Sequence, residues 1–90
     1  MECNAQLLEA LLPNATIRQI AATIRGAWLN PYFGAKPYIE AMQSLDNITE
    51  DYYQDPGSEI VAYFLANATR WHGETARLIK KELNRRLKET

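Results

Sequence analysis

The chain has 90 residues, 47% of them hydrophobic and 23% charged, and its formal net charge at pH 7 is -1. This length supports one hydrophobic core, so we expect a single domain over residues 1–90. The composition excludes disordered and fibrous proteins, and no apolar run reaches the ~20 residues of a membrane-spanning helix.

Cysteine use and the first residues bear on the compartment. The single cysteine, Cys3, has no disulfide partner within the chain, which fits a free thiol in a reducing environment. The start of the chain also lacks the basic stretch and long apolar centre of a signal peptide. We therefore expect a cytoplasmic protein with no membrane partner.

Two amphipathic helices are expected in the first third of the chain. A leucine cluster at residues 7–12 predicts a short helix that Pro13 ends, because proline disfavours a helical residue before it. Asn14 then suits the N-cap of a longer helix over residues 15–29. Its apolar positions recur at three- and four-residue spacing and share one face: Ile17, Ile20, Ala21, Ile24 and Trp28.

The connector that follows is rich in aromatic residues. Pro31 stops the long helix, and Pro37 fits the first position of the next one, where its missing N–H costs nothing. Tyr38 starts the apolar face of that third helix, whereas Tyr32 and Phe33 have no helical face to join. We expect one of these two rings to pack in the core and the other to contact a partner.

A polar stretch and a fourth helix come next. Residues 46–58 have turn chemistry, with a short helical turn over residues 48–53 as one option. Asp55 and Pro56 suit the cap and first position of the fourth helix. Apolar residues cover well over half of its circumference, which is typical of a helix in the middle of a bundle: Ile60, Val61, Tyr63, Phe64, Leu65 and Ala68.

The last helix, over residues 74–88, carries a narrow apolar stripe that ends at Leu87. If this helix is continuous with Trp71, then Trp71 and Leu78 form a second apolar spot away from that stripe. No stretch alternates with the period of a strand. The sequence therefore predicts an all-α protein, a compact single-domain bundle of four to five helices.

Charge is distributed unevenly along the chain. Residues 37–69 contain carboxylates but no lysine or arginine, whereas cations prevail after residue 69. A pI near 5.8 makes nucleic acid the less favoured partner, and the complementary halves leave a homo-oligomer open. The cations that we consider for contact with an acidic partner or with nucleic acid are Arg77, Lys80, Lys81, Arg85 and Arg86.

No catalytic or metal constellation is recognisable. A zinc site needs three or four Cys, His or carboxylate ligands, and this chain has one cysteine and one histidine, His72, far apart in sequence. The acidic stretch over residues 51–59 is not a calcium loop, because Pro56 stands where the sharp-turn glycine is required. We expect a protein that is not an enzyme and holds no cofactor or metal.

Two segments, residues 28–42 with YFGAKPYIEAM and residues 60–83 with YFLANAT and WHGETAR, carry a recognisable pattern. Together they resemble small uncharacterised helical proteins encoded by bacterial phages and other mobile elements, notably of actinobacteria. The resemblance brings no established activity. It implies a small protein that acts inside a bacterial cell by binding a host or phage protein, with inhibition of a host defence system as one form of this.

We therefore expect a non-catalytic protein that binds another protein through aromatic side chains, which often anchor protein interfaces. Arg85 and Arg86 would supply an electrostatic rim. The candidate partner-binding residues are Tyr32, Phe33, Tyr52 and Tyr53.

Overall fold

Five α-helices and a short β-hairpin make up residues 5–89, the part of the chain that the computed structural model describes. The predicted all-α bundle is confirmed, whereas Cys3 lies outside the described residues. Within this range, no helix has both the length and the apolar character needed to cross a membrane. The elements are α1 (Ala5–Leu11), the 3-10 turn η1 (Leu12–Asn14), α2 (Ile17–Ala27), α3 (Lys36–Met42), β1 (Asp51–Tyr52), β2 (Asp55–Pro56), α4 (Gly57–Ala66) and α5 (Glu74–Lys88).

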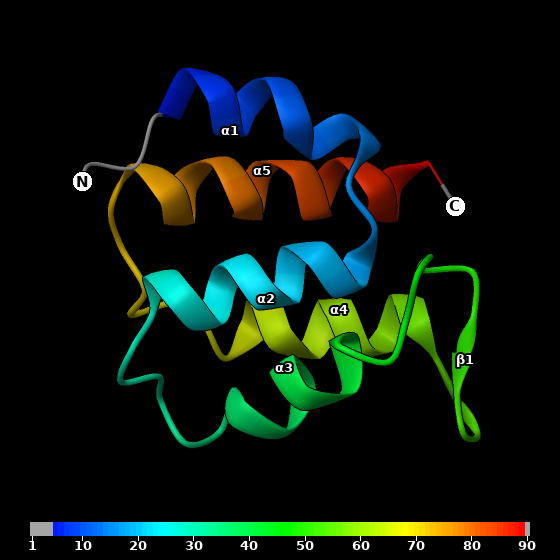
Figure 1. Cartoon of the computed structure of the whole chain (residues 1–90). Helices are drawn as coiled ribbons and strands as arrows, with labels where there is room; N and C mark the ends of the chain where they lie inside the picture. Colours follow the sequence, from blue (N-terminus) through cyan, green and yellow to red (C-terminus); the bar gives the residue numbers. More distant parts are fainter. Residues whose placement is uncertain (1–4, 90) are drawn as a thin grey trace.

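The helices stack in layers with α5 near the middle. Figure 1 shows α1 lying along one side of α5 and α2 along the other, with α3 and α4 completing the far side of the bundle. The hairpin and the connector between α2 and α3 lie at opposite ends of the α3–α4 layer (Figure 1). The α3–α4 layer is therefore bordered by the connector at one end and by the hairpin at the other.

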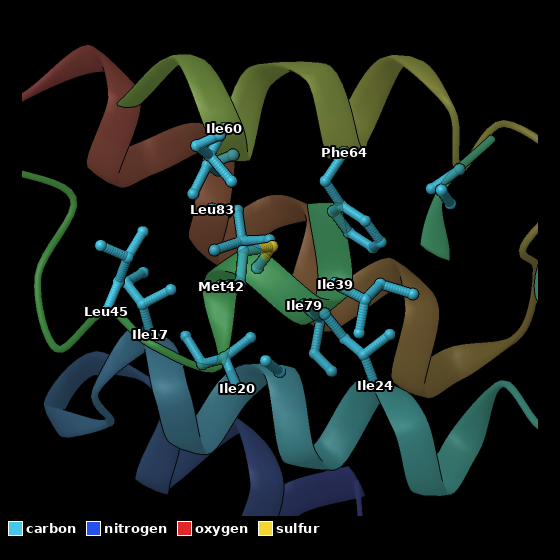
Figure 2. Close-up of a cluster of buried hydrophobic side chains, with 14 of the residues drawn as sticks. Ile17, Ile20, Ile24, Ile39, Met42, Leu45, Ile60, Phe64, Ile79 and Leu83 are labelled. Atoms are coloured by element: carbon cyan, nitrogen blue, oxygen red, sulfur yellow. The ribbon is translucent and has the colours of Figure 1, made fainter. Parts of the chain in front are cut away.

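The core is formed where α2, α3, α4 and α5 meet (Figure 2). The apolar face predicted for α2 is confirmed, since Ile17, Ile20 and Ile24 are fully buried. The opposing elements supply Ile39, Met42, Ile60, Phe64, Ile79 and Leu83. Burial of apolar side chains from four helices is the main force that holds the bundle together.

The cap of α2 is Thr16, so the prediction of Asn14 is wrong. The Thr16 hydroxyl accepts a hydrogen bond from the Gln19 backbone N–H at 3.0 Å, and the Thr16 N–H donates to the Gln19 side chain at 2.9 Å. This reciprocal pair satisfies two backbone donors at the start of the helix. Asn14 instead belongs to η1, the extra turn between the two helices.

Residues 46–58 fold differently from the prediction. Asp51–Tyr52 and Asp55–Pro56 pair as antiparallel strands in place of a helical turn, and α4 begins at Gly57. Tyr53, at the tip, adopts a positive φ of 56°, a conformation that reverses the chain tightly. Strands of two residues are too short to show alternation in a sequence, and Asp55 and Pro56 are therefore hairpin residues, not a helix start.

The fourth helix is not surrounded by other helices. Only one side of α4 is buried, through Ile60, Val61 and Phe64. Ala62 and Tyr63 on the other side are exposed, so the predicted position in the middle of the bundle is wrong. The reason is that α4 lies in an outer layer, where its surplus apolar surface has no helix to cover it.

The predicted apolar spot of Trp71 and Leu78 is also absent, because both side chains are buried. Trp71 precedes α5, whose start is marked by Gly73 with a φ of 111°. Its ring stacks on that of Trp28, with centroids 5.5 Å apart and an interplanar angle of 8°. Leu78 is buried in α5, the helix on which α1 packs.

Candidate partner-binding surface

One side of α4 presents small, aromatic and acidic side chains to solvent. Glu59, Ala62, Tyr63 and Ala66 are all exposed, and their spacing of three and four residues places them on one face of the helix. We call the surface formed by these residues together with Tyr32, Phe33 and Tyr38 the α4 face.

Tyr38 extends the α4 face onto α3. Its ring lies 5.6 Å from that of Tyr63, centroid to centroid, where α3 packs against α4. Tyr63 is 50% exposed, and Tyr38 is half-buried and packs against the core. One side of the pair therefore contacts the fold and the other side faces solvent. The two rings form an aromatic patch in the middle of the α4 face.

Tyr32 and Phe33 adjoin the C-terminal end of α4. A Cβ at Gly34 would lie 2.6 Å from a ring carbon of Tyr32 and 2.8 Å from the Asn67 side-chain oxygen. The connector therefore lies close to the residue that follows α4, and a side chain at Gly34 would displace the Tyr32 ring or the Asn67 side chain. Tyr32 is 41% and Phe33 75% exposed, with ring centroids 4.8 Å apart. The expectation that one of the two packs in the core is wrong, because the turn projects both outward.

The other predicted pair lies on the hairpin. Tyr52 is half-buried and packs against the core, while Tyr53 at the tip is 87% exposed. Their ring centroids lie 4.7 Å apart. Since the hairpin and the connector occupy opposite ends of the α3–α4 layer, the four predicted residues do not form one cluster (Figure 1).

Sequence reasoning missed Tyr63 and Tyr38, the residues in the middle of this layer. It counted both as core residues because they are aromatic and share a helix with buried residues. A sharper signal was present in α4: Ile60, Val61 and Phe64 are enough to form a buried stripe, and Tyr63 falls to one side of it.

The predicted basic residues on α5 are mostly occupied within the fold. Arg85 pairs with Glu82 at 2.6 Å and with Glu89 at 2.8 Å, and Arg77 pairs with Glu74 at 2.6 Å. These arginines therefore offer fewer donors to a partner than the sequence suggests.

Two further cations of α5 hold neighbouring segments in place. Arg86 pairs with Glu82 at 2.6 Å and donates to the Leu12 carbonyl at 2.6 Å, which ties α5 to η1. Lys80 donates to the Trp71 carbonyl at 2.6 Å. Arg86 is half-buried, so the expected rim of Arg85 and Arg86 is wrong for Arg86, which serves the fold.

Electrostatics follow from these contacts. Hydrogen bonds from Arg85, with further help from Arg86, hold the pKa of the buried Glu82 carboxyl below its usual value. Partial burial lowers the pKa of Lys80. Among residues 5–89, Lys81 is the only one of the five predicted cations that has neither an ion pair nor a hydrogen bond from its side chain.

Metal ligation has no obvious place in the described chain. Across residues 5–89, no three His, Cys, Asp or Glu side chains come together in a way that could hold a metal ion. His72 is exposed and lies just before α5.

No protein-family model, curated protein or solved structure shows a significant match to this chain.

Proposed function

We propose that this chain is a small non-catalytic protein of phage or mobile-element type that binds another protein through the α4 face. The supporting observation is a predominantly apolar helix with one side in solvent. A surface helix of a globular protein normally turns polar residues outward, and α4 instead exposes Ala62, Tyr63 and Ala66. Exposed apolar surface of this kind marks interaction sites.

The aromatic side chains on this surface suit a role as anchors. Tyrosine buries a large area at low entropic cost and retains a hydroxyl that can reach a polar partner. Tyr63 and Phe33 are 50% and 75% exposed, so a partner can cover a large part of each ring. Truncating an anchor of this type costs ~2 kcal/mol of binding energy, about thirtyfold in affinity.

The biological setting of the proposal comes from the resemblance to phage and mobile-element proteins. In this setting the chain acts in the cytoplasm of a bacterial host, its partner is a host or phage protein, and inhibition of a host defence system is one form that this binding takes. A protein with this role acts through an interface and does not need a catalytic site.

The test is affinity capture from a bacterial lysate with quantification of each bound protein. We expect a specific partner to be retained by the wild type and lost by the Tyr63→Ala variant and by the Tyr32→Ala, Phe33→Ala double variant. Leu11→Ala is the matched control, since Leu11 is 58% exposed on α1, which packs on a different side of α5.

Thermal unfolding of each variant separates binding from folding. The three aromatic side chains are at least 41% exposed, so the variants should keep their free energy of unfolding to within ~1 kcal/mol. Loss of the partner with Leu11→Ala, but not with the aromatic variants, would move the interface to α1 and refute the proposal.

Nucleic-acid binding by α5 is the second candidate. The observation in its favour is that Lys81 and Lys88 are both exposed on this helix. It predicts retention of DNA or RNA at low salt that falls as salt rises and when these two lysines are changed to glutamine. No mobility shift at low salt would remove this candidate.

A further inference from the structure

The layer that carries the α4 face is predominantly acidic, and Lys36 at the start of α3 is its one cation among residues 36–66. Residues 37–69, which include most of α3, the hairpin and α4, contain no lysine or arginine. Every carboxylate in this range is exposed: Glu40, Asp46, Glu50, Asp51, Asp55 and Glu59. A partner that docks on this layer meets a negative potential.

Several of these carboxylates are free to pair with a partner. Asp46 already pairs with Arg18 at 3.3 Å, and Glu50 accepts the Asp46 backbone N–H at 3.0 Å. By contrast, Glu40, Asp51, Asp55 and Glu59 form no ion pair with any residue in the range 5–89.

Glu59 connects the free carboxylates to the aromatic patch. It precedes Tyr63 by one helical turn, so the two side chains are neighbours on the α4 face. Asp51 and Asp55 lie on the hairpin, which packs against α4, and the Gly57 N–H donates to the Glu50 carbonyl at 2.7 Å. Glu59 and Tyr63 therefore share the exposed side of α4, and the hairpin carboxylates lie next to the N-terminal end of that helix.

Building on the proposed function, we propose that the occupant of the α4 face is a segment of another protein that carries lysine or arginine beside apolar side chains. The cations pair with Glu59 and the hairpin carboxylates and lie over the Tyr63 ring, which attracts a positive charge on its face. The apolar side chains contact Ala62, Ala66 and Phe33.

The surface also gives the segment a direction. At the connector end, Arg70 and Tyr32 line the same shallow hollow of about 290 Å³, so this end carries a positive charge. The opposite end of α4 faces the acidic hairpin. The cations of the occupant therefore lie toward the hairpin and its apolar side chains toward the connector.

A second copy of the chain is a poorer occupant. Most basic residues lie on α5, where Arg77, Arg85 and Arg86 are already paired within the chain and only Lys81 and Lys88 remain exposed without an ion pair among residues 5–89. A dimer that used these arginines would lose ion pairs within each chain and gain ion pairs between the two chains. The net gain in free energy would be small, because exposed ion pairs have similar, small energies.

The test uses the full chain and two synthetic peptides of one length, each an amphipathic helix with leucine on one face. The polar face is lysine in one peptide and glutamate in the other. NMR titration should show that the lysine peptide binds and shifts backbone amides of α4 and the hairpin, and that raised salt weakens it. Equal binding of the glutamate peptide, or shifts centred on α1, would overturn the proposal.

A matched pair of charge reversals tests the site itself. Glu59→Lys should weaken the lysine peptide roughly tenfold, because it replaces an attractive pair by a repulsive one. Glu9→Lys makes the same change at an exposed position on α1 and should leave the affinity unaltered. An equal effect of the two variants would mean that only net charge matters, which contradicts a defined site.

The same variants, in the capture experiment, separate this inference from the proposed function. Loss of the captured partner with Tyr63→Ala but not with Glu59→Lys would leave the α4 face as the interface and overturn the basic occupant. Loss with neither variant would refute the proposed function itself. A dimer at low salt that Glu59→Lys dissociates, seen by light scattering, would identify a second copy as the occupant and also overturn the inference.

Discussion

Replacing Gly57 by alanine tests how the hairpin is fixed against α4. A Cβ at this position would lie 2.6 Å from the Glu50 carbonyl oxygen and 2.9 Å from that of Ile48. Both are backbone atoms, so no side chain can rotate to make room and residues 48–50 must move. An extra carbon forced into a packed site costs about 1–3 kcal/mol. For a domain of this size, each kcal/mol lowers the Tm by about 4–8 °C.

Gly26→Ala is the control for this prediction. A Cβ at Gly26 would meet nothing within 4 Å, and the residue lies near the end of α2. Alanine there should stabilise the protein by up to ~1 kcal/mol, because it restricts the unfolded chain and favours the helix. Urea unfolding of both variants, followed by circular dichroism, gives the two free energies. If the Gly57→Ala variant unfolds at the wild-type urea concentration or above, this result contradicts the close contact between Gly57 and the backbone of residues 48–50.

Two further predictions concern the ties within the fold. Glu82→Gln should cost about 1–3 kcal/mol at pH 7, because the half-buried Arg86 loses its charged acceptor. The pKa of Glu82 is lowered in the folded state, so the ionised carboxylate stabilises the fold fully above about pH 4.3, and this stabilisation is lost as the pH falls through the folded pKa. Urea unfolding at a series of pH values should therefore show that the variant loses less stability in acid than the wild type does. Trp71→Ala should cost about 3–5 kcal/mol in thermal unfolding, since it removes a buried ring stacked on Trp28. Leu29→Ala, a large-to-small change at an 85% exposed position, should stay within ~0.5 kcal/mol; a Trp71 variant that is equally mild would contradict the stacked core.

The helices were predictable because their signals are local. In α2 the spacing of Ile17, Ile20 and Ile24 places three apolar side chains on one face whatever packs against it. The hairpin was not predictable in the same way. Its strands have two residues each, and the reason for Gly57 is the Glu50 carbonyl seven residues earlier in the chain, which becomes a neighbour only after the turn has formed.

The candidate surface was predictable only in part, because exposure depends on which helices pack together. Of the four residues to which the sequence pointed, Tyr32, Phe33 and Tyr53 are exposed, whereas Tyr52 is half-buried and packs against the core. It placed Tyr63 in the core, since the composition of α4 fits a helix covered on every side. Periodicity within α4 separates Tyr63 from the stripe of Ile60, Val61 and Phe64, but whether a neighbour covers that second side is decided by the path of the other helices.

The connector that carries the exposed Tyr32 and Phe33 is held at both ends. Trp28 at its start stacks on Trp71 and meets the edge of Phe64, with centroids 6.5 Å apart in the second pair. Ala35 at its end is fully buried, and its N–H donates to the Tyr32 carbonyl at 2.8 Å. Both ends of the turn are therefore fixed by contacts within the fold. Fixed ends reduce the number of conformations open to the residues between them, which lowers the ordering cost of binding through Tyr32 and Phe33.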